Sequence, residues 1–150
     1  MPQNANIFTT IFTALATSGL TTWVVDHVLN SKTRARSKEL QKEYEICGNF
    51  CSYIENCQSN GSTFWAKNRK ELPPELAAAV LFSQTRAEGA YLQLKSIGYD
   101  DVISVIELFE LLTGGDYDDE ERPANPKIAT NIATKAAEIC TNVDNFKNSL

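Results

Sequence analysis

The chain has 150 residues, of which 43% are hydrophobic and 22% are charged, and its formal net charge is −5. This length suits one compact domain with a short appendage, and the hydrophobic fraction is typical of a folded protein. A net acidic chain is a poor general binder of nucleic acid, which requires clustered Lys and Arg side chains, so we expect no nucleic-acid partner.

The first predicted element is a helix in a membrane. Residues 7–25 carry no charge, and at about 1.5 Å per residue a helix of this length crosses the hydrocarbon core of a bilayer. Trp23 suits the membrane interface, and residues 1–6 contain no basic side chain. A basic cluster follows the apolar segment and comprises Lys32, Arg34, Arg36 and Lys38.

The positive-inside rule places this cluster on the cytoplasmic side. We therefore expect a single-span protein of the bacterial inner membrane, in contact with lipid. Residues 1–30 form the transmembrane helix, and residues 31–150 form a cytoplasmic helical body. There are two alternatives for the first segment. Ala14-Leu15-Ala16 resembles a signal-peptide cleavage site, although no positive charge precedes it. The many threonines would also suit a core helix of a soluble protein.

Hydroxyl side chains in this segment fall mostly on one side of the predicted helix. At about 100° per residue, most of the threonines lie opposite Ile7, Ile11 and Leu15. A helix with an apolar face and a hydroxyl face fits helix–helix packing or the lining of a wet lumen, so we expect a homo-oligomer. Alternatively, each hydroxyl bonds to the carbonyl one turn earlier and tolerates lipid. The stripe consists of Thr9, Thr10, Thr13, Thr17 and Thr21.

The body begins with a periodic segment. Apolar residues three or four apart predict an amphipathic helix over residues 37–57, which can run on from the first helix because no Pro or Gly lies between Leu20 and Cys47. Residues 58–63, with Asn60-Gly61 at their centre, have the composition of a turn. We expect the adjacent Phe64 and Trp65 to close one end of a bundle.

Three further helices complete the predicted body. Pro73-Pro74 opens one that stops at Gly98, and Asp100 or Asp101 caps a very apolar one that ends at Gly114-Gly115. The last is predicted over residues 126–150. Because the connections are short, the predicted fold is all-α, with an antiparallel helical bundle after the transmembrane helix.

The cysteines and the acidic loop do not match known metal-site patterns. Cys47, Cys51, Cys57 and Cys140 lack zinc-site spacing, so we interpret them as reduced thiols packed like small hydrophobic side chains. The carboxylates of residues 114–126 do not follow the EF-hand order, which favours a solvated loop. We expect no metal and no cofactor.

Catalytic signals are also weak. His27 is the single histidine and lies at the predicted membrane boundary, and no Gly-rich phosphate loop is present. We therefore expect the protein not to be an enzyme and assign no catalytic residue.

The order of these parts carries a resemblance. A charge-free N-terminal helix, the basic cluster KTRARSK and a small helical body resemble the compact membrane effectors of bacterial anti-phage defence, such as the accessory pore protein of type VI-B CRISPR systems. The resemblance implies an oligomeric effector that forms a pore or perturbs the membrane. The Arg-x(4–6)-His motif of the ribonuclease-like bodies in that group is absent, because every arginine follows His27. The competing function is a membrane-anchored adaptor whose bundle binds a partner protein.

Overall fold

A computed structural model describes the backbone of residues 4–150 and the side chains from residue 30 onward. The described chain is all-helical, without a strand. Its α-helices are α1 (Asn4–Ala66), α2 (Pro74–Ser96), α3 (Val102–Thr113) and α4 (Pro126–Lys147), and a short 3-10 helix, η1 (Arg69–Glu71), follows α1. The chain divides into two units, residues 1–41 and 42–150. Residues 4–41 of the first unit are a helical stretch of α1, and the second unit is a helical bundle.

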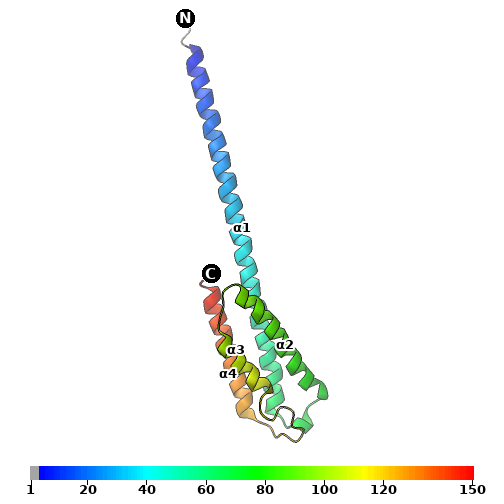
Figure 1. Cartoon of the computed structure of the whole chain (residues 1–150). Helices are drawn as coiled ribbons and strands as arrows, with labels where there is room; N and C mark the ends of the chain where they lie inside the picture. Colours follow the sequence, from blue (N-terminus) through cyan, green and yellow to red (C-terminus); the bar gives the residue numbers. More distant parts are fainter. Residues whose placement is uncertain (1–3) are drawn as a thin grey trace. The chain divides into compact units, whose positions relative to one another are not determined.

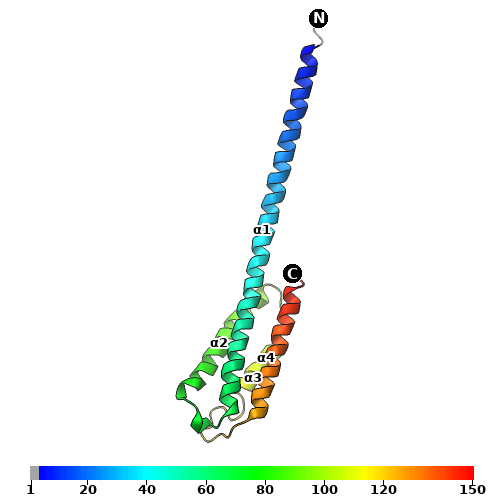
Figure 2. The same ribbon diagram turned by 180° about the vertical axis from the view of Figure 1, so that it is seen from behind.

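Within residues 42–150, the end of α1 and helices α2, α3 and α4 run alternately in opposite directions (Figures 1 and 2). All four contribute fully buried side chains to one core. The predicted all-α bundle is therefore confirmed. The largest of these buried side chains are Trp65, Phe50, Phe64, Ile54, Leu94, Leu108, Leu112, Ile132 and Ile139.

The helix boundaries follow local signals in the sequence. Pro74 occupies the first turn of α2, and Gly98, with a φ of 105°, follows the end of that helix. The Asp101 carboxylate caps α3 by accepting a hydrogen bond from the Ser104 N–H at 3.3 Å. Asn125 caps α4 by accepting one from the Ile128 N–H at 3.2 Å. The predicted helix starts and the stop at Gly98 are thus confirmed.

The predicted turn at residues 58–63 is wrong, because α1 continues through it to Ala66. Gly61 is needed here for packing instead. A Cβ atom at this position would lie 2.2 Å from Leu112 Cδ2 and 3.3 Å from Ile132 Cδ1. The glycine therefore allows α3 and α4 to approach the α1 backbone closely, and the core contacts that result keep an Asn-Gly pair helical.

Among residues 30–150, no helix has the length and hydropathy that crossing a membrane requires. The predicted span over residues 7–25 lies outside the side chains that the structure describes. The predicted boundary between residues 30 and 31 also stays a prediction.

Candidate functional site: an exposed apolar face on two helices

The site residues predicted from the sequence lie in the first unit. Thr9, Thr10, Thr13, Thr17, Thr21 and Trp23 fall outside the described side chains. The basic cluster, Lys32, Arg34, Arg36 and Lys38, is described, and all four side chains are exposed. Arg36 forms an ion pair with Glu39 at 3.3 Å, in which both side chains are more than half exposed. Exposed cations of this kind are free to meet anionic lipid or solvent.

The described residues contain no cluster of His, Cys, Asp and Glu that could hold a metal ion. In the acidic loop, Asp119 accepts a hydrogen bond from the Glu121 N–H at 2.9 Å, and the Glu121 carboxylate forms an ion pair with Lys70. Both members of that pair are largely exposed. These contacts fold the loop on itself and onto η1.

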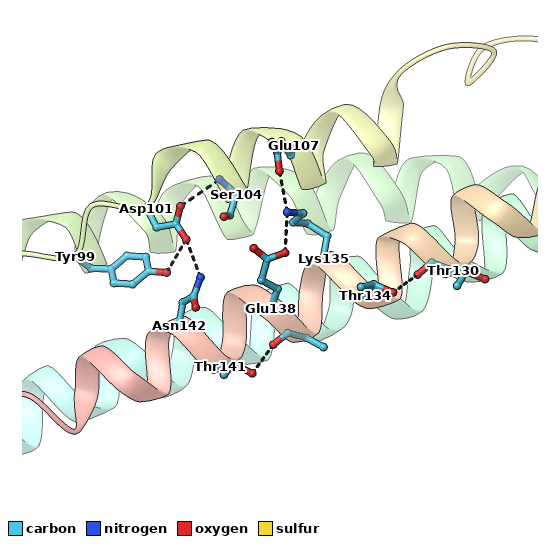
Figure 3. A network of polar contacts seen from close by, with 11 residues as sticks. Tyr99, Asp101, Ser104, Glu107, Thr130, Thr134, Lys135, Glu138, Thr141 and Asn142 are labelled. Carbon is cyan, nitrogen blue, oxygen red and sulfur yellow. Dashed lines mark hydrogen bonds and ion pairs between the residues drawn. The ribbon is translucent and has the colours of Figure 1, made fainter.

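A polar network joins α3 to α4 (Figure 3). Lys135 of α4 lies between Glu107 at 2.8 Å and Glu138 at 2.7 Å. Hydrogen bonds from this lysine to the two carboxylates raise its pKa, so it stays protonated. A lysine held in this way is a poor nucleophile and a poor base, because both roles need the neutral amine.

A groove of about 520 Å³ lies beside this lysine. Its lining combines three carboxylates and the protonated Lys135 with neutral side chains, and it lacks a free nucleophile near a base. The lining residues are Glu107, Glu110, Leu111, Asn131, Thr134, Lys135 and Glu138. The groove therefore offers no arrangement typical of catalysis.

Arg122 is the most enclosed charged side chain of the described body, and sequence analysis did not single it out. It is 2% exposed, and its guanidinium lies over the rings of Phe64 at 4.6 Å and Trp65 at 4.3 Å. Nη2 donates to the Phe64 carbonyl at 2.9 Å, and Nη1 donates to the Pro123 carbonyl at 3.1 Å. Phe64 belongs to the last turn of α1, so this arginine places a positive charge at the negative end of the helix dipole.

The aromatic pair also closes the end of the bundle, as predicted. Trp65 Nε1 donates to the Leu112 carbonyl at 3.1 Å, and the Asn125 N–H donates to the Trp65 carbonyl at 2.7 Å. Arg122 is thus part of a structural closure of α1 and does not present its guanidinium to a ligand.

Packing of the bundle does not account for a group of large hydrophobic side chains that are exposed on its surface. The described side chains include seven large exposed hydrophobic residues, and all but Tyr44 lie on α2 and α3. Leu92 and Ile103 are each 69% exposed, and Phe82 is 62% exposed. Isolated apolar residues are normal on a surface, but a group on two neighbouring helices is typical of an interaction site. Phe82 is set apart, because it lies two residues from Gln84, the α2 residue that meets α3, and is therefore on the opposite side of that helix. The other five, called here the α2–α3 face, are Leu81, Leu92, Val102, Ile103 and Ile106.

Helical periodicity shows how the two helices contribute to this face. Thr113 Oγ1 lies 3.4 Å from Gln84 Oε1, a contact that marks where α3 and α2 meet. Val102, Ile106 and Thr113 follow one another at spacings of four and seven residues, so they share the edge of α3 that faces α2. Leu92 lies eight residues beyond Gln84, at about the height of Ile106 because the helices are antiparallel. Exposed apolar side chains from both helices therefore border the seam between them.

Carboxylates lie on the same two helices as the α2–α3 face. Glu88 of α2 and Glu110 of α3 are exposed and α3 carries no basic residue, whereas Glu107 is paired with Lys135. Of the two cations of α2, Lys95 pairs with Asp100 at 3.7 Å. Arg86, whose Cζ lies 5.0 Å from the ring centre of Phe82, is two residues from Gln84 and is therefore on the side of α2 away from α3. The face therefore combines an apolar seam with an acidic border.

Sequence analysis identified α3 as the most apolar helix of the body but did not identify its exposed side. The signal was present, because apolar residues occupy too much of its circumference for one buried stripe. Searches among family models, curated proteins and solved structures found no match to this chain.

Proposed function

We propose that the protein is a non-enzymatic, membrane-anchored adaptor whose helical body binds a partner protein on the α2–α3 face. The observation that carries the proposal is the apolar seam between α2 and α3, left exposed beside a core that is otherwise well buried. Burying apolar surface is the main driving force for protein association.

The border of the face favours a partner of particular chemistry. A helix with an apolar stripe fits a seam between two helices, and Lys or Arg on its flanks complements the carboxylates of Glu88 and Glu110. A second copy of the same face would instead bring like charges of α3 together, which is unfavourable. The proposed occupant is therefore a basic amphipathic helix of another protein.

The anchor in this proposal is the charge-free segment of residues 7–25. The exposed basic cluster behind it supports an orientation with the body in the bacterial cytoplasm. Membrane flotation together with protease protection in right-side-out and inverted vesicles tests the anchor. Full extraction by salt without detergent, as a monomer, would contradict it.

The partner surface is tested with the full chain in detergent and two synthetic helical peptides that share one apolar stripe. One peptide has Lys flanks and the other has Glu flanks. We expect the Lys peptide to bind more tightly, with NMR shifts confined to α2 and α3, and its affinity to fall as salt rises. Equal binding of both peptides, or shifts on α1 and α4, would contradict the proposal.

Substitutions on and away from the α2–α3 face test whether the peptide binds there. Leu92→Glu with Ile103→Glu should weaken binding of the Lys peptide at least tenfold while leaving the fold intact, because both side chains are mostly exposed. Ala137→Glu, an exposed position on α4, is the matched control and should bind as the parent does. If the parent protein forms a dimer that the double variant abolishes, the occupant is a second copy and the proposed partner is wrong.

A second candidate function rests on the threonine stripe. An oligomeric effector that forms a pore or perturbs the membrane in anti-phage defence would use Thr9, Thr13, Thr17 and Thr21 as its lumen or helix contact. Sizing in detergent and dye entry into expressing cells test this candidate. A stable ring-sized oligomer that admits dye favours the effector, and a monomer that binds a second protein favours the adaptor.

A further inference from the structure

Two thiols from distant parts of the chain meet between α1 and α4. Cys140 Sγ of α4 lies 4.0 Å from the backbone carbonyl oxygen of Cys51 in α1. Both side chains are half-buried, whereas Cys47 and Cys57 are buried, and all four cysteines are free. The pair therefore combines proximity with access to small molecules from solvent.

The two thiols are not equivalent. A side-chain hydrogen bond between the two thiols lowers the pKa of Cys140 and raises the pKa of Cys51. Burial also raises the pKa of Cys51 and opposes the lowering at Cys140, and the carboxylates of Asp144 and Glu55 face the pair. Burial raises the pKa of Cys57 to about 11, so that thiol stays protonated and unreactive.

We propose that Cys140 and Cys51 form a peroxide-sensitive site whose product is a reversible disulfide that joins α4 to α1. The contact between Cys140 Sγ and the Cys51 carbonyl carries this assignment, because it places the two residues side by side, and a disulfide between them then requires Cα atoms within about 7 Å.

The chemistry balances with hydrogen peroxide as the two-electron oxidant. The Cys140 thiolate attacks one peroxide oxygen, so the S–O bond forms, the O–O bond breaks, and hydroxide leaves and takes up the proton lost by that thiol. The Cys51 sulfur then attacks the Cys140 sulfenic acid. The S–S bond forms, the S–O bond breaks, and the departing hydroxide leaves as water with the Cys51 proton.

The disulfide would close the long loop between residues 51 and 140, which includes α2 and α3. Closing a loop of this length restricts the unfolded chain, so the oxidised protein should melt at a higher temperature. A reducing compartment keeps the thiols free, and a pulse of peroxide would convert the protein to the form with the Cys51–Cys140 disulfide.

The test treats the full-length protein in detergent with stoichiometric peroxide. We expect the mass to fall by two hydrogens, a peptide that links Cys51 to Cys140 after digestion, a higher melting temperature, and full reversal by dithiothreitol. Cys47→Ser and Cys57→Ser are controls that should keep the linkage. A bridge through Cys47, a bridge between two copies, or retention of both thiols in excess peroxide would overturn the site.

Single variants test the order of the two steps. In Cys51→Ser, the Cys140 sulfenic acid has no resolving thiol and should be trapped by a dimedone reagent. In Cys140→Ser, Cys51 should remain unlabelled at the same dose. Circular dichroism checks that each variant folds, and the corresponding alanine variant replaces one that does not. Equal labelling of the two variants would overturn the assignment of Cys140 as the attacking thiolate.

Discussion

A methyl group added at position 61 would clash with side chains of the core. Its carbon would lie 2.2 Å from Leu112 Cδ2, and Leu112 is fully buried. Gly61→Ala should therefore lower the free energy of unfolding. Overpacking costs about 1–3 kcal/mol, which outweighs a gain of about 1 kcal/mol in helix propensity. Urea denaturation followed by circular dichroism measures the difference.

Two other helical glycines provide the matched controls. Gly48 in α1 and Gly89 in α2 are exposed, and a Cβ atom at either would meet nothing within 4 Å. Gly48→Ala and Gly89→Ala should each raise stability by about 0.5–1 kcal/mol. If Gly61→Ala raised stability as these controls should, the close approach of α3 and α4 at Gly61 would be refuted.

Substitution of Arg122 should also lower the stability of the protein through the contacts of a single side chain. Arg122→Met removes both charge-assisted hydrogen bonds and leaves the Phe64 carbonyl without its donor, so we expect a loss of about 2–3 kcal/mol. Arg122→Lys should recover little, because one ammonium cannot reach both carbonyls and stack on the aromatic rings.

Lys70→Met is the control for Arg122 in the same region. Lys70 forms an ion pair with Glu121 on the surface, and such pairs contribute at most about 1 kcal/mol. Thermal unfolding of the three variants ranks them. Equal losses in Arg122→Met and Lys70→Met would show that the buried guanidinium does not support the end of α1.

At the scale of elements, Asp101 ties α3 to α4 and gives the bundle a pH dependence. Burial raises the pKa of Asp101, but hydrogen bonds from Asn142 and Ser104 outweigh it and hold the pKa below its ordinary 3.8. The unfolded chain therefore binds this proton more readily. The stabilisation is complete above pH 3.8 and is lost as the pH falls through the lower, folded value.

The variant Asp101→Asn isolates this contribution. It can still cap α3, but its amide offers Asn142 a poorer acceptor, so a loss of about 1 kcal/mol is expected at neutral pH. Melting temperatures of parent and variant should converge between pH 5 and about pH 2, because all other carboxylates are common to both. A constant gap over this range would mean that Asp101 is not the titrating group.

Local signals were sufficient for most helix boundaries and insufficient for the contacts between helices. Pro74, Gly98 and Asp101 act on their own neighbours, so their effects can be inferred without a fold. Gly61 and Arg122 act on residues far along the chain, and a local interpretation therefore mistook Gly61 for a turn and overlooked Arg122. The exposed side of α3 needed both kinds of information, since periodicity locates its apolar residues but only packing shows which ones α2 and α4 cover.

At the scale of the whole molecule, the hydrogen bonds of threonines in the helical body suggest how the threonines of residues 9–21 could be satisfied. Helical threonines in residues 42–150 bond back to the carbonyl one turn earlier, as Thr134 does to Thr130 at 3.0 Å and Thr141 does to Ala137 at 2.8 Å (Figure 3). The same bond would let the threonines of residues 9–21 face lipid without any lumen or helix contact. A simple anchor and an oligomeric effector therefore predict different consequences when these hydroxyls are removed.

Replacing Thr13 and Thr17 with Leu separates the two functions. In an effector, the leucines dewet the lumen or wedge the helices apart, so oligomer size in detergent and dye entry should both fall although the segment becomes more apolar. In an anchor, membrane insertion and partner binding on the α2–α3 face should stay as in the parent. Ile11→Val with Leu15→Val, on the predicted lipid face, should change little in either case. If the Thr-to-Leu variant assembles and admits dye as the parent does, the stripe neither lines a lumen nor forms a helix contact.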